Sequence, residues 1–118
     1  LSKSDIISLH LPSTAETIGM VDKEFLSKMK SNAILINTAR GSLINEGDLY
    51  MALKNNWILG VGLDAFAVEP VTEDNPLLNL DNIVVLPHVG GNTVDMQSTM
   101  INHVIDNIIR VNSKHLIK

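Results

Sequence analysis

The sequence predicts an α/β fold in which a parallel sheet carries flanking helices. Short apolar runs recur along the chain, segments with helical patterning lie between them, and the runs are apolar at consecutive positions. Consecutive apolar residues are typical of strands that are buried on both faces of a parallel sheet. Strands that alternate with helices indicate β-α-β units, in which neighbouring strands run parallel.

Four apolar runs are expected to be strands. The first begins at Ile6 and stops at Pro12, and the others cover 33–37, 58–63 and 83–86. Their lengths fit buried strands better than helices. We therefore expect a sheet of four parallel strands.

Three helices are expected, and each follows a residue whose side chain can accept hydrogen bonds from the first helical turn. The last helix has apolar residues at helical spacing, which make a wide apolar stripe. The caps and helices are Asp22 before 23–29, Asn45 before a helix to about 55, and Thr93 at the start of a long helix at about 93–111.

The composition is that of an ordinary globular domain. The 118 residues are 45% hydrophobic and 19% charged, which is enough for one modest core. A net charge of −4 without clustered Lys and Arg argues against a nucleic-acid surface. No apolar run is long enough for a membrane helix. There is no cysteine, so thiolate metal sites are excluded.

Reactive side chains follow three of the expected strands in turn. Arg40 follows the second strand, Asp64 and Glu69 follow the third, and His88 follows the fourth. In an open parallel sheet, ligands bind beyond the carboxyl ends of the strands. The loop over 67–82 is also longer than a compact domain usually contains without a function. These side chains are therefore expected to gather at one edge and to border a site.

These residue types suit one kind of chemistry. An Arg fork binds a carboxylate with two hydrogen bonds, and a His can exchange the proton of a hydroxyl while a nearby Glu orients its ring. Carboxylate binding and proton exchange are what a hydroxy-acid or keto-acid reaction requires. Each side chain alone could simply face solvent at a strand end. Three at successive strand ends favour a catalytic set of Arg40, Glu69 and His88.

Five ordered motifs resemble a known family. They are similar to the signatures of the nucleotide-binding domain of the D-isomer-specific 2-hydroxyacid dehydrogenases, which include phosphoglycerate, glycerate and D-lactate dehydrogenases. The resemblance implies the C-terminal half of a Rossmann-type parallel sheet. The motifs are Leu9-His10-Leu11-Pro12, Asn37-Thr38-Ala39-Arg40-Gly41, Gly62-Leu63-Asp64-Ala65-Phe66, Val68-Glu69-Pro70 and Pro87-His88-Val89-Gly90-Gly91.

The resemblance also implies roles. Arg40 would bind the substrate carboxylate, His88 would be the general acid and base, and Glu69 would pair with it. The implied activity is hydride transfer between a nicotinamide cofactor and a D-2-hydroxy or 2-keto acid, most similar to that of a phosphoglycerate dehydrogenase. NAD is the expected cofactor, NADP stays open, and no metal is expected. The implied cofactor-binding residues are Leu11, Thr38, Ala39, Arg40, Asp64, His88, Val89, Gly90 and Gly91.

Residues 1–118 are expected to be part of a nicotinamide-binding domain, because the family's phosphate-binding loop and substrate domain would precede Leu1. The segment Gly60-Val61-Gly62-Leu63-Asp64-Ala65 matches a dinucleotide-binding pattern, but no amphipathic helix is expected after it. We interpret its glycines as strand residues that allow tight packing. The 118 residues alone are therefore expected to be inactive. The resemblance further implies a cytoplasmic homodimer.

Two other interpretations stay open. The chain could be a binding or regulatory module that retains the half-fold without catalysis, although such a module needs no acid/base pair. It could also belong to another doubly wound enzyme such as a methyltransferase, which gives no reason for the Arg, Glu and His set. The dehydrogenase interpretation accounts for all three side chains.

Overall fold

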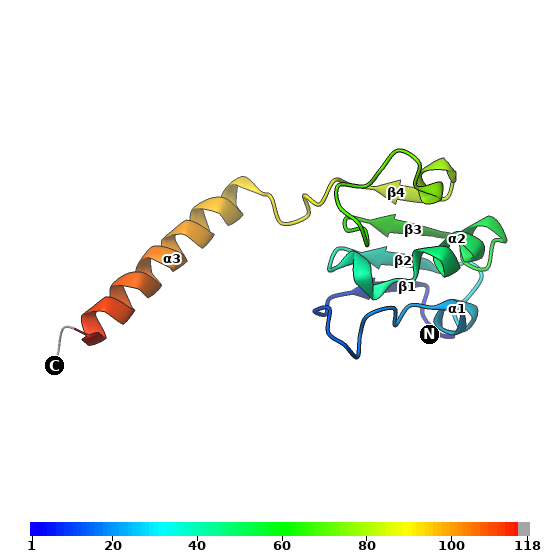
Figure 1. Ribbon diagram of the computed structural model, residues 1–118. Coiled ribbons are helices and arrows are strands. Elements are labelled where there is room, and N and C mark those ends of the chain that lie inside the picture. The colour runs from blue at the N-terminus through cyan, green and yellow to red at the C-terminus, as the bar shows by residue number, and fades with distance from the viewer. Residues whose placement is uncertain (116–118) are drawn as a thin grey trace. The chain divides into compact units, whose positions relative to one another are not determined.

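The structure of the protein, a computed structural model, describes residues 1–115. The chain divides into two compact units, Leu1–His88 and Val89–Lys118. The first unit holds the sheet, and the second holds one long helix (Figure 1).

The first unit contains a sheet of four strands in which every neighbouring pair is parallel. The order of the strands across the sheet is their order along the chain (Figure 1). The expected α/β fold with a parallel sheet is therefore confirmed. The strands are β1 (Ile6–Leu9), β2 (Ile34–Asn37), β3 (Gly60–Leu63) and β4 (Ile83–Val85).

Both α-helices of the first unit begin at the caps that the sequence predicts. The Asp22 side chain accepts a hydrogen bond from Phe25 N at 2.9 Å, and α1 (Lys23–Ser27) follows. The Asn45 side chain accepts from Asp48 N at 3.1 Å, and α2 (Glu46–Lys54) follows. Each cap satisfies one of the N–H groups that a first turn leaves without a partner.

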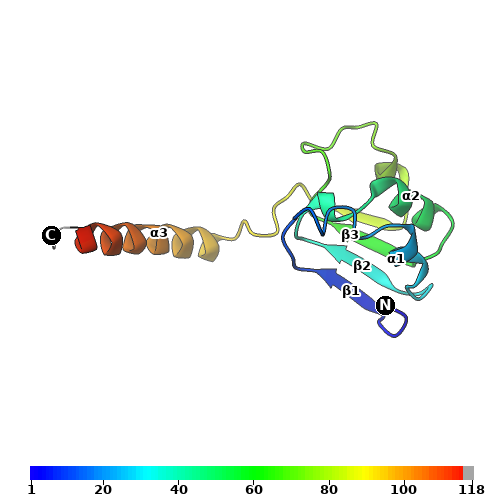
Figure 2. The same cartoon turned by 60° about the horizontal axis from the view of Figure 1, so that its bottom comes forward.

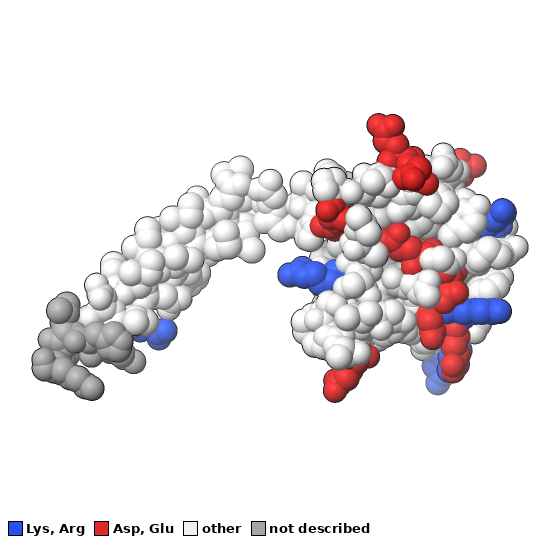
Figure 3. All heavy atoms as spheres, in the orientation of Figure 1, with Lys and Arg blue, Asp and Glu red and all other residues white. Residues whose placement is uncertain are grey.

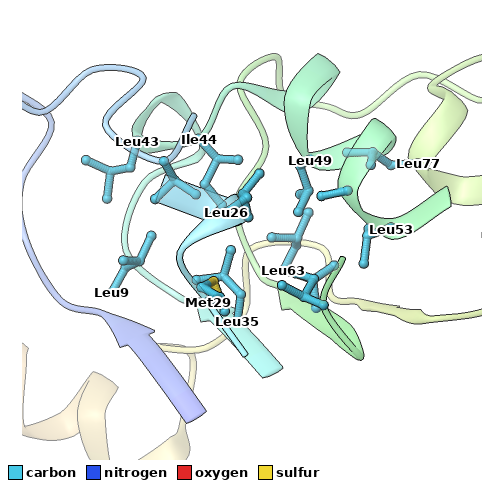
Figure 4. Close-up of a cluster of buried hydrophobic side chains, with 14 of the residues drawn as sticks. Leu9, Leu26, Met29, Leu35, Leu43, Ile44, Leu49, Leu53, Leu63 and Leu77 are labelled. Carbon is cyan, nitrogen blue, oxygen red and sulfur yellow. The ribbon is translucent and has the colours of Figure 1, made fainter. Parts of the chain in front are cut away.

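The core lies between the sheet and these two helices. α1 and α2 cover one face of the sheet (Figure 2), and apolar side chains from both layers point toward one another (Figure 4). Alternate residues of β2 and β3 are buried because successive side chains of a strand point to opposite faces. The largest fully buried apolar side chains are Val21, Leu26, Leu35, Leu43, Leu49, Leu53, Ile58 and Leu77.

The other face of the sheet differs from the sequence prediction. Strands buried on both faces were expected, yet the side chains of Ile6 and Val84 are 61% and 68% exposed. Ile34 and Ile36, on the same face of β2, are only half-buried. The prediction was wrong for this unit because both of its α-helices pack on the opposite face (Figure 2).

The long segment 67–82 is more ordered than expected. It contains a short 3₁₀ helix, η2 (Pro76–Asn79), whose cap Asn75 accepts a hydrogen bond from Leu77 N at 3.0 Å. A second 3₁₀ helix, η1 (Gly41–Leu43), follows β2. Gly60 to Leu63 form β3, and η2 is the next helical element. The glycine pattern at 60–65 is therefore not followed by the helix that a dinucleotide-binding fingerprint requires. This agrees with the sequence, which predicted no helix there.

The second unit consists of a turn and α3 (Val94–His115). The Thr93 hydroxyl accepts a hydrogen bond from Met96 N at 3.2 Å, so the predicted cap is confirmed. Within residues 1–115, no helix is both long and apolar enough to cross a bilayer. The large apolar side chains of α3 are exposed at Val94, Met96, Met100, Ile101, Val104, Ile105, Ile108, Ile109 and Val111.

Candidate active site

The parallel strands deliver the predicted catalytic residues beyond their carboxyl ends. β2 ends at Asn37 and Arg40 follows it, β3 ends at Leu63 and leads to Glu69, and β4 leads to His88. All three residues therefore follow the same edge of one sheet, as the sequence predicts.

Glu69 and His88 form a hydrogen-bonded pair. The distance between His88 Nδ1 and Glu69 Oε2 is 2.7 Å. A carboxylate can only accept, so Nδ1 carries the proton in this contact. The other carboxylate oxygen, Oε1, accepts from Phe66 N at 2.8 Å. Because Nδ1 is engaged, Nε2 is the ring nitrogen that can exchange a proton with a ligand.

The surroundings of Glu69 favour its ionised form. The hydrogen bond from His88, followed by the one from the Phe66 backbone, holds the pKa of the Glu69 carboxyl below its ordinary value of 4.5. Partial burial and the charge of Asp64 oppose this lowering of the pKa, while the charge of His88 adds to it. Glu69 is therefore a carboxylate at neutral pH and can stabilise a protonated His88 ring.

The backbone at His88 adopts an uncommon conformation. Its φ angle is +56°, in the left-handed region that residues other than glycine rarely occupy. The preceding residue is Pro87, and the peptide bond between Glu69 and Pro70 is cis. Non-glycine residues with positive φ are found disproportionately at functional sites.

The pair borders the larger of two hollows at this edge. Its volume is ≈ 520 Å³, and Asp64, Glu69 and His88 supply its polar side chains. The remaining walls are apolar, which suits a site that binds a small ligand and excludes water. The apolar lining comes from Phe66, Pro70, Val71, Leu86 and Pro87.

Arg40 is held at the end of a turn that Asn37 organises. Asn37 is fully buried, its Nδ2 donates to Arg40 O at 2.9 Å, and its Oδ1 accepts from Ala39 N at 3.0 Å. The Arg40 side chain is exposed and donates from Nη1 to Ala39 O at 2.7 Å. Since a guanidinium has further N–H groups, it can still bind an anion.

Arg40 does not line the hollow of the Glu69–His88 pair. It borders a second hollow of ≈ 390 Å³, together with Leu11, Thr38 and Ala39. The structure therefore brings together Glu69 with His88, and Arg40 with three of the predicted cofactor-binding residues. His10 and Pro12 complete the second hollow.

A close backbone contact joins the segment after β2 to the segment after β3. A Cβ atom on Gly41 would lie 1.9 Å from the carbonyl carbon of Phe66 and 2.4 Å from Ala67 N. No side chain fits there, so the residue after Arg40 must be glycine for the two segments to touch. Gly41 follows Arg40, and Phe66 borders the hollow of Glu69.

The remaining predicted residues fall in two groups. Asp64 is buried, borders the first hollow, and donates its backbone N–H to Asn37 O at 2.9 Å. Val89, Gly90 and Gly91 belong to the second unit, and their assignment to a cofactor rests on the sequence.

Sequence reasoning gave no role to Asn37 or to the backbone of Phe66. Asn37 could have been found, because an Asn at the end of an apolar strand and before a turn often hydrogen-bonds the turn's backbone. The hydrogen bond from Phe66 N to Glu69 spans only three residues, within an irregular segment that carries no such pattern. The contact of the Phe66 backbone with Gly41 had no signal either, because it joins segments that are distant in the sequence.

The charges on this unit are mixed. On the face drawn in Figure 3, acidic and basic side chains are interspersed, and the basic ones form no continuous surface. Among the residues that the structure describes, no three His, Cys, Asp or Glu side chains gather in an arrangement that could hold a metal ion.

The profile of one family, described as "D-isomer specific 2-hydroxyacid dehydrogenase, NAD binding domain", matches residues 1–90. The chain belongs to this family. Its four-stranded parallel sheet therefore forms part of the NAD-binding domain of this family.

Curated relatives carry two kinds of name. A glyoxylate reductase of Korarchaeum cryptofilum is 46% identical over 109 residues, which are 92% of this chain and 33% of that protein. A D-3-phosphoglycerate dehydrogenase of Archaeoglobus fulgidus is 39% identical over 111 residues, 94% of this chain and 21% of that protein. The chain thus spans about a third or less of the length of these relatives.

Solved structures match over nearly the whole chain. An acyclic imino acid reductase in complex with NADPH and D-Arg has a TM-score of 0.89 and 40% identity, over 96% of this chain and 36% of that one. A D-isomer specific 2-hydroxyacid dehydrogenase of Lactobacillus delbrueckii, in its NAD-complexed form, has a TM-score of 0.86 and 29% identity. The match covers 97% of this chain and 38% of that one.

Proposed function

We propose that the full protein transfers hydride between a nicotinamide cofactor and a small D-2-hydroxy or 2-keto acid. The observation that carries this proposal is the 2.7 Å hydrogen bond between His88 and Glu69 beside a hollow whose only other polar side chain among its lining residues is Asp64. A binding or regulatory module has no need of such an acid/base pair. Membership of the dehydrogenase family supports the same activity.

The residues present fit part of a dinucleotide. The hollow beside Arg40 combines apolar side chains of Leu11, Pro12 and Ala39 with the polar side chains of His10, Thr38 and Arg40. Cofactor sites also place polar groups that fix the orientation of the ligand beside apolar surface. When bound, the nicotinamide would supply or accept the hydride. We propose that Leu11, Thr38 and Ala39 in this hollow, together with Asp64 in the other, hold the nicotinamide end of the cofactor.

In the proposed reaction, each side chain has one task. Arg40 binds the carboxylate of the acid with its guanidinium fork. His88 donates a proton from Nε2 to the substrate oxygen when a keto acid is reduced, and removes it in the opposite direction. Glu69 holds Nδ1 and stabilises the charged ring. The hollow's apolar wall excludes water from the reacting atoms.

The experiment that tests this function replaces His88 and Arg40 in the full-length protein. His88→Ala should lower kcat by about 100-fold or more, because proton transfer is lost. Arg40→Ala should raise KM and lower kcat. His103→Ala, which removes an exposed His from α3, is the control and should retain activity. Near-normal kcat for His88→Ala at neutral pH would refute the mechanism.

The proposal also names a type of acid and a cofactor. We favour a substrate of the phosphoglycerate type, and relatives are named for glyoxylate, hydroxypyruvate or 3-phosphoglycerate. Activity should be measured on these three acids with NAD(H) and NADP(H). We propose NAD, while some similar structures carry NADPH.

We also propose that residues 1–118 form the C-terminal part of the nicotinamide-binding domain and that the full protein is a homodimer. The exposed apolar face around Ile6 and Val84 supports association. Light scattering on the full-length protein would measure its mass. A cytoplasmic location stays a prediction.

A further inference from the structure

A second carboxylate holds both ends of the loop that carries Glu69. Glu46 is the first residue of α2, and its side chain is half-buried. Its Oε1 accepts from Ala67 N at 2.7 Å, and its Oε2 accepts from Asn75 Nδ2 at 3.0 Å. These two donors stand before and after Glu69 in the sequence, so one side chain ties the loop at both sides.

The first of these bonds acts next to the acid/base pair. Ala67 follows Phe66, whose N–H donates to Glu69 Oε1 at 2.8 Å. Two consecutive backbone N–H groups are thus directed to two different carboxylates, Glu46 and Glu69. The orientation of this short backbone segment decides whether the Phe66 N–H can reach Glu69.

Gly41 fixes the same segment from another side. The space for its absent Cβ is filled by the backbone of Phe66 and Ala67. Packing against Gly41 sets where the segment lies, and hydrogen bonding to Glu46 sets how it is turned. Glu69, whose other oxygen holds His88, depends on both.

An ordinary explanation for Glu46 is that acidic residues favour the first turn of a helix. Asp48, in the same turn of α2, allows a comparison. Its carboxylate accepts from Lys23 N at 3.0 Å and so connects α2 to α1. Asn45 already caps α2. Both hydrogen bonds that the structure gives Glu46 lead to the Glu69 loop, which helix stabilisation does not require.

We infer that Glu46 is a positioning residue for the Glu69–His88 pair, because its carboxylate holds the loop backbone in the orientation that lets Phe66 N–H fix Glu69. The inference rests on the proposed function of that pair. Glu46 touches neither His88 nor the hollow, so it acts only through the loop.

The test measures the pKa of the Glu69 carboxyl by ¹³C NMR in the 118-residue chain. The groups that bear on Glu69 are His88, the Phe66 N–H and Asp64. In Glu46→Ala the Phe66 hydrogen bond weakens, and the pKa of Glu69 should rise by roughly half a unit. Loss of a nearby negative charge alone would lower this pKa. The sign of the shift therefore separates positioning from simple electrostatics.

Two further variants make the result decisive. Glu46→Asp keeps the charge on a shorter side chain that cannot reach both donors, so it should also raise the pKa of Glu69. It replaces Glu46→Ala as the test if that variant does not fold. Asp48→Ala is the matched control and should leave the Glu69 titration unchanged. An unchanged or lowered pKa in the folded Glu46 variants, or an equal rise in Asp48→Ala, would overturn the inference.

A kinetic measurement on the full-length protein complements the titration. Glu46→Ala should lower kcat several-fold with little change in KM, because the substrate-binding Arg40 is untouched. If the proposed function were wrong, His88→Ala would retain turnover, whereas the Glu69 titration needs no turnover. Failure of the function and failure of the positioning role are therefore distinguishable.

Discussion

At the scale of single residues, the Glu69 carboxylate uses both of its oxygens to hold the segment after β3 to His88. One oxygen is fixed by the Phe66 N–H at 2.8 Å and the other by His88 Nδ1 at 2.7 Å. Because the pKa of Glu69 is lowered in the folded chain, the pair contributes its full stabilisation above pH 4.5. This stabilisation is lost as the pH falls through the lowered value.

Removal of the His88 ring should return the Glu69 pKa toward its ordinary value, because the hydrogen bond from His88 is the largest cause of the lowering. In His88→Ala, ¹³C NMR should show the Glu69 carboxyl titrating at a higher pH than in the parent chain. His10→Ala is the control, since His10 hydrogen-bonds Ser8 instead. An unchanged Glu69 titration in His88→Ala would contradict the pairing.

Predictions from the sequence succeeded for residues whose contacts are local. Asp22, Asn45 and Thr93 make the expected caps because each bonds a backbone N–H three residues away. The strand-end positions of Arg40 and His88 follow from parallel topology. That Arg40 and His88 border separate hollows could not be predicted, because the lining of each hollow depends on how segments distant in the sequence pack together.

At the scale of elements, the site depends on how closely the segment after β2 approaches the segment after β3. Gly41 has the backbone of Phe66 where a side chain would stand. Gly62, in the middle of β3, would instead place a Cβ in open space. A side chain is therefore excluded at Gly41 but has room at Gly62, so the two glycines can be compared by the same substitution.

Gly41→Ala should destabilise the chain by about 2–4 kcal/mol, because backbone atoms must move apart to accept the methyl group. Gly62→Ala should change the free energy of unfolding by about 0.5 kcal/mol or less, and in the stabilising direction. Urea unfolding of both variants measures the difference. Equal midpoints would show that the Gly41 contact is not tight.

At the scale of the whole molecule, the proposed catalytic side chains all lie in the first unit, Leu1–His88. The glycine pattern at 60–65 runs through β3 and continues as an irregular segment. A dinucleotide's pyrophosphate is normally held where such glycines lead directly into a helix. In the proposed function, the 118 residues therefore supply groups for the nicotinamide end and the substrate.

The dissociation constant of NADH from the 118-residue chain should consequently be higher than micromolar. Isothermal titration calorimetry of this chain with NADH measures the affinity, and the full-length protein provides the positive control. A micromolar dissociation constant for the 118 residues would show that they hold the pyrophosphate as well. It would refute the proposal that they form only part of the nicotinamide-binding domain.

The sheet has the same strand order in space as along the chain, and this order has a consequence for biosynthesis. In a growing polypeptide β1 is made before β2, β3 and β4, so each of these three strands finds its preceding neighbour already made. The sheet can extend at one edge, without any strand inserting between two others, although each parallel pairing must wait for its crossover segment. The hydrogen bond between Glu69 and His88 joins the last two segments of the unit. The Glu69–His88 pair therefore forms after all four strands of the sheet have been made.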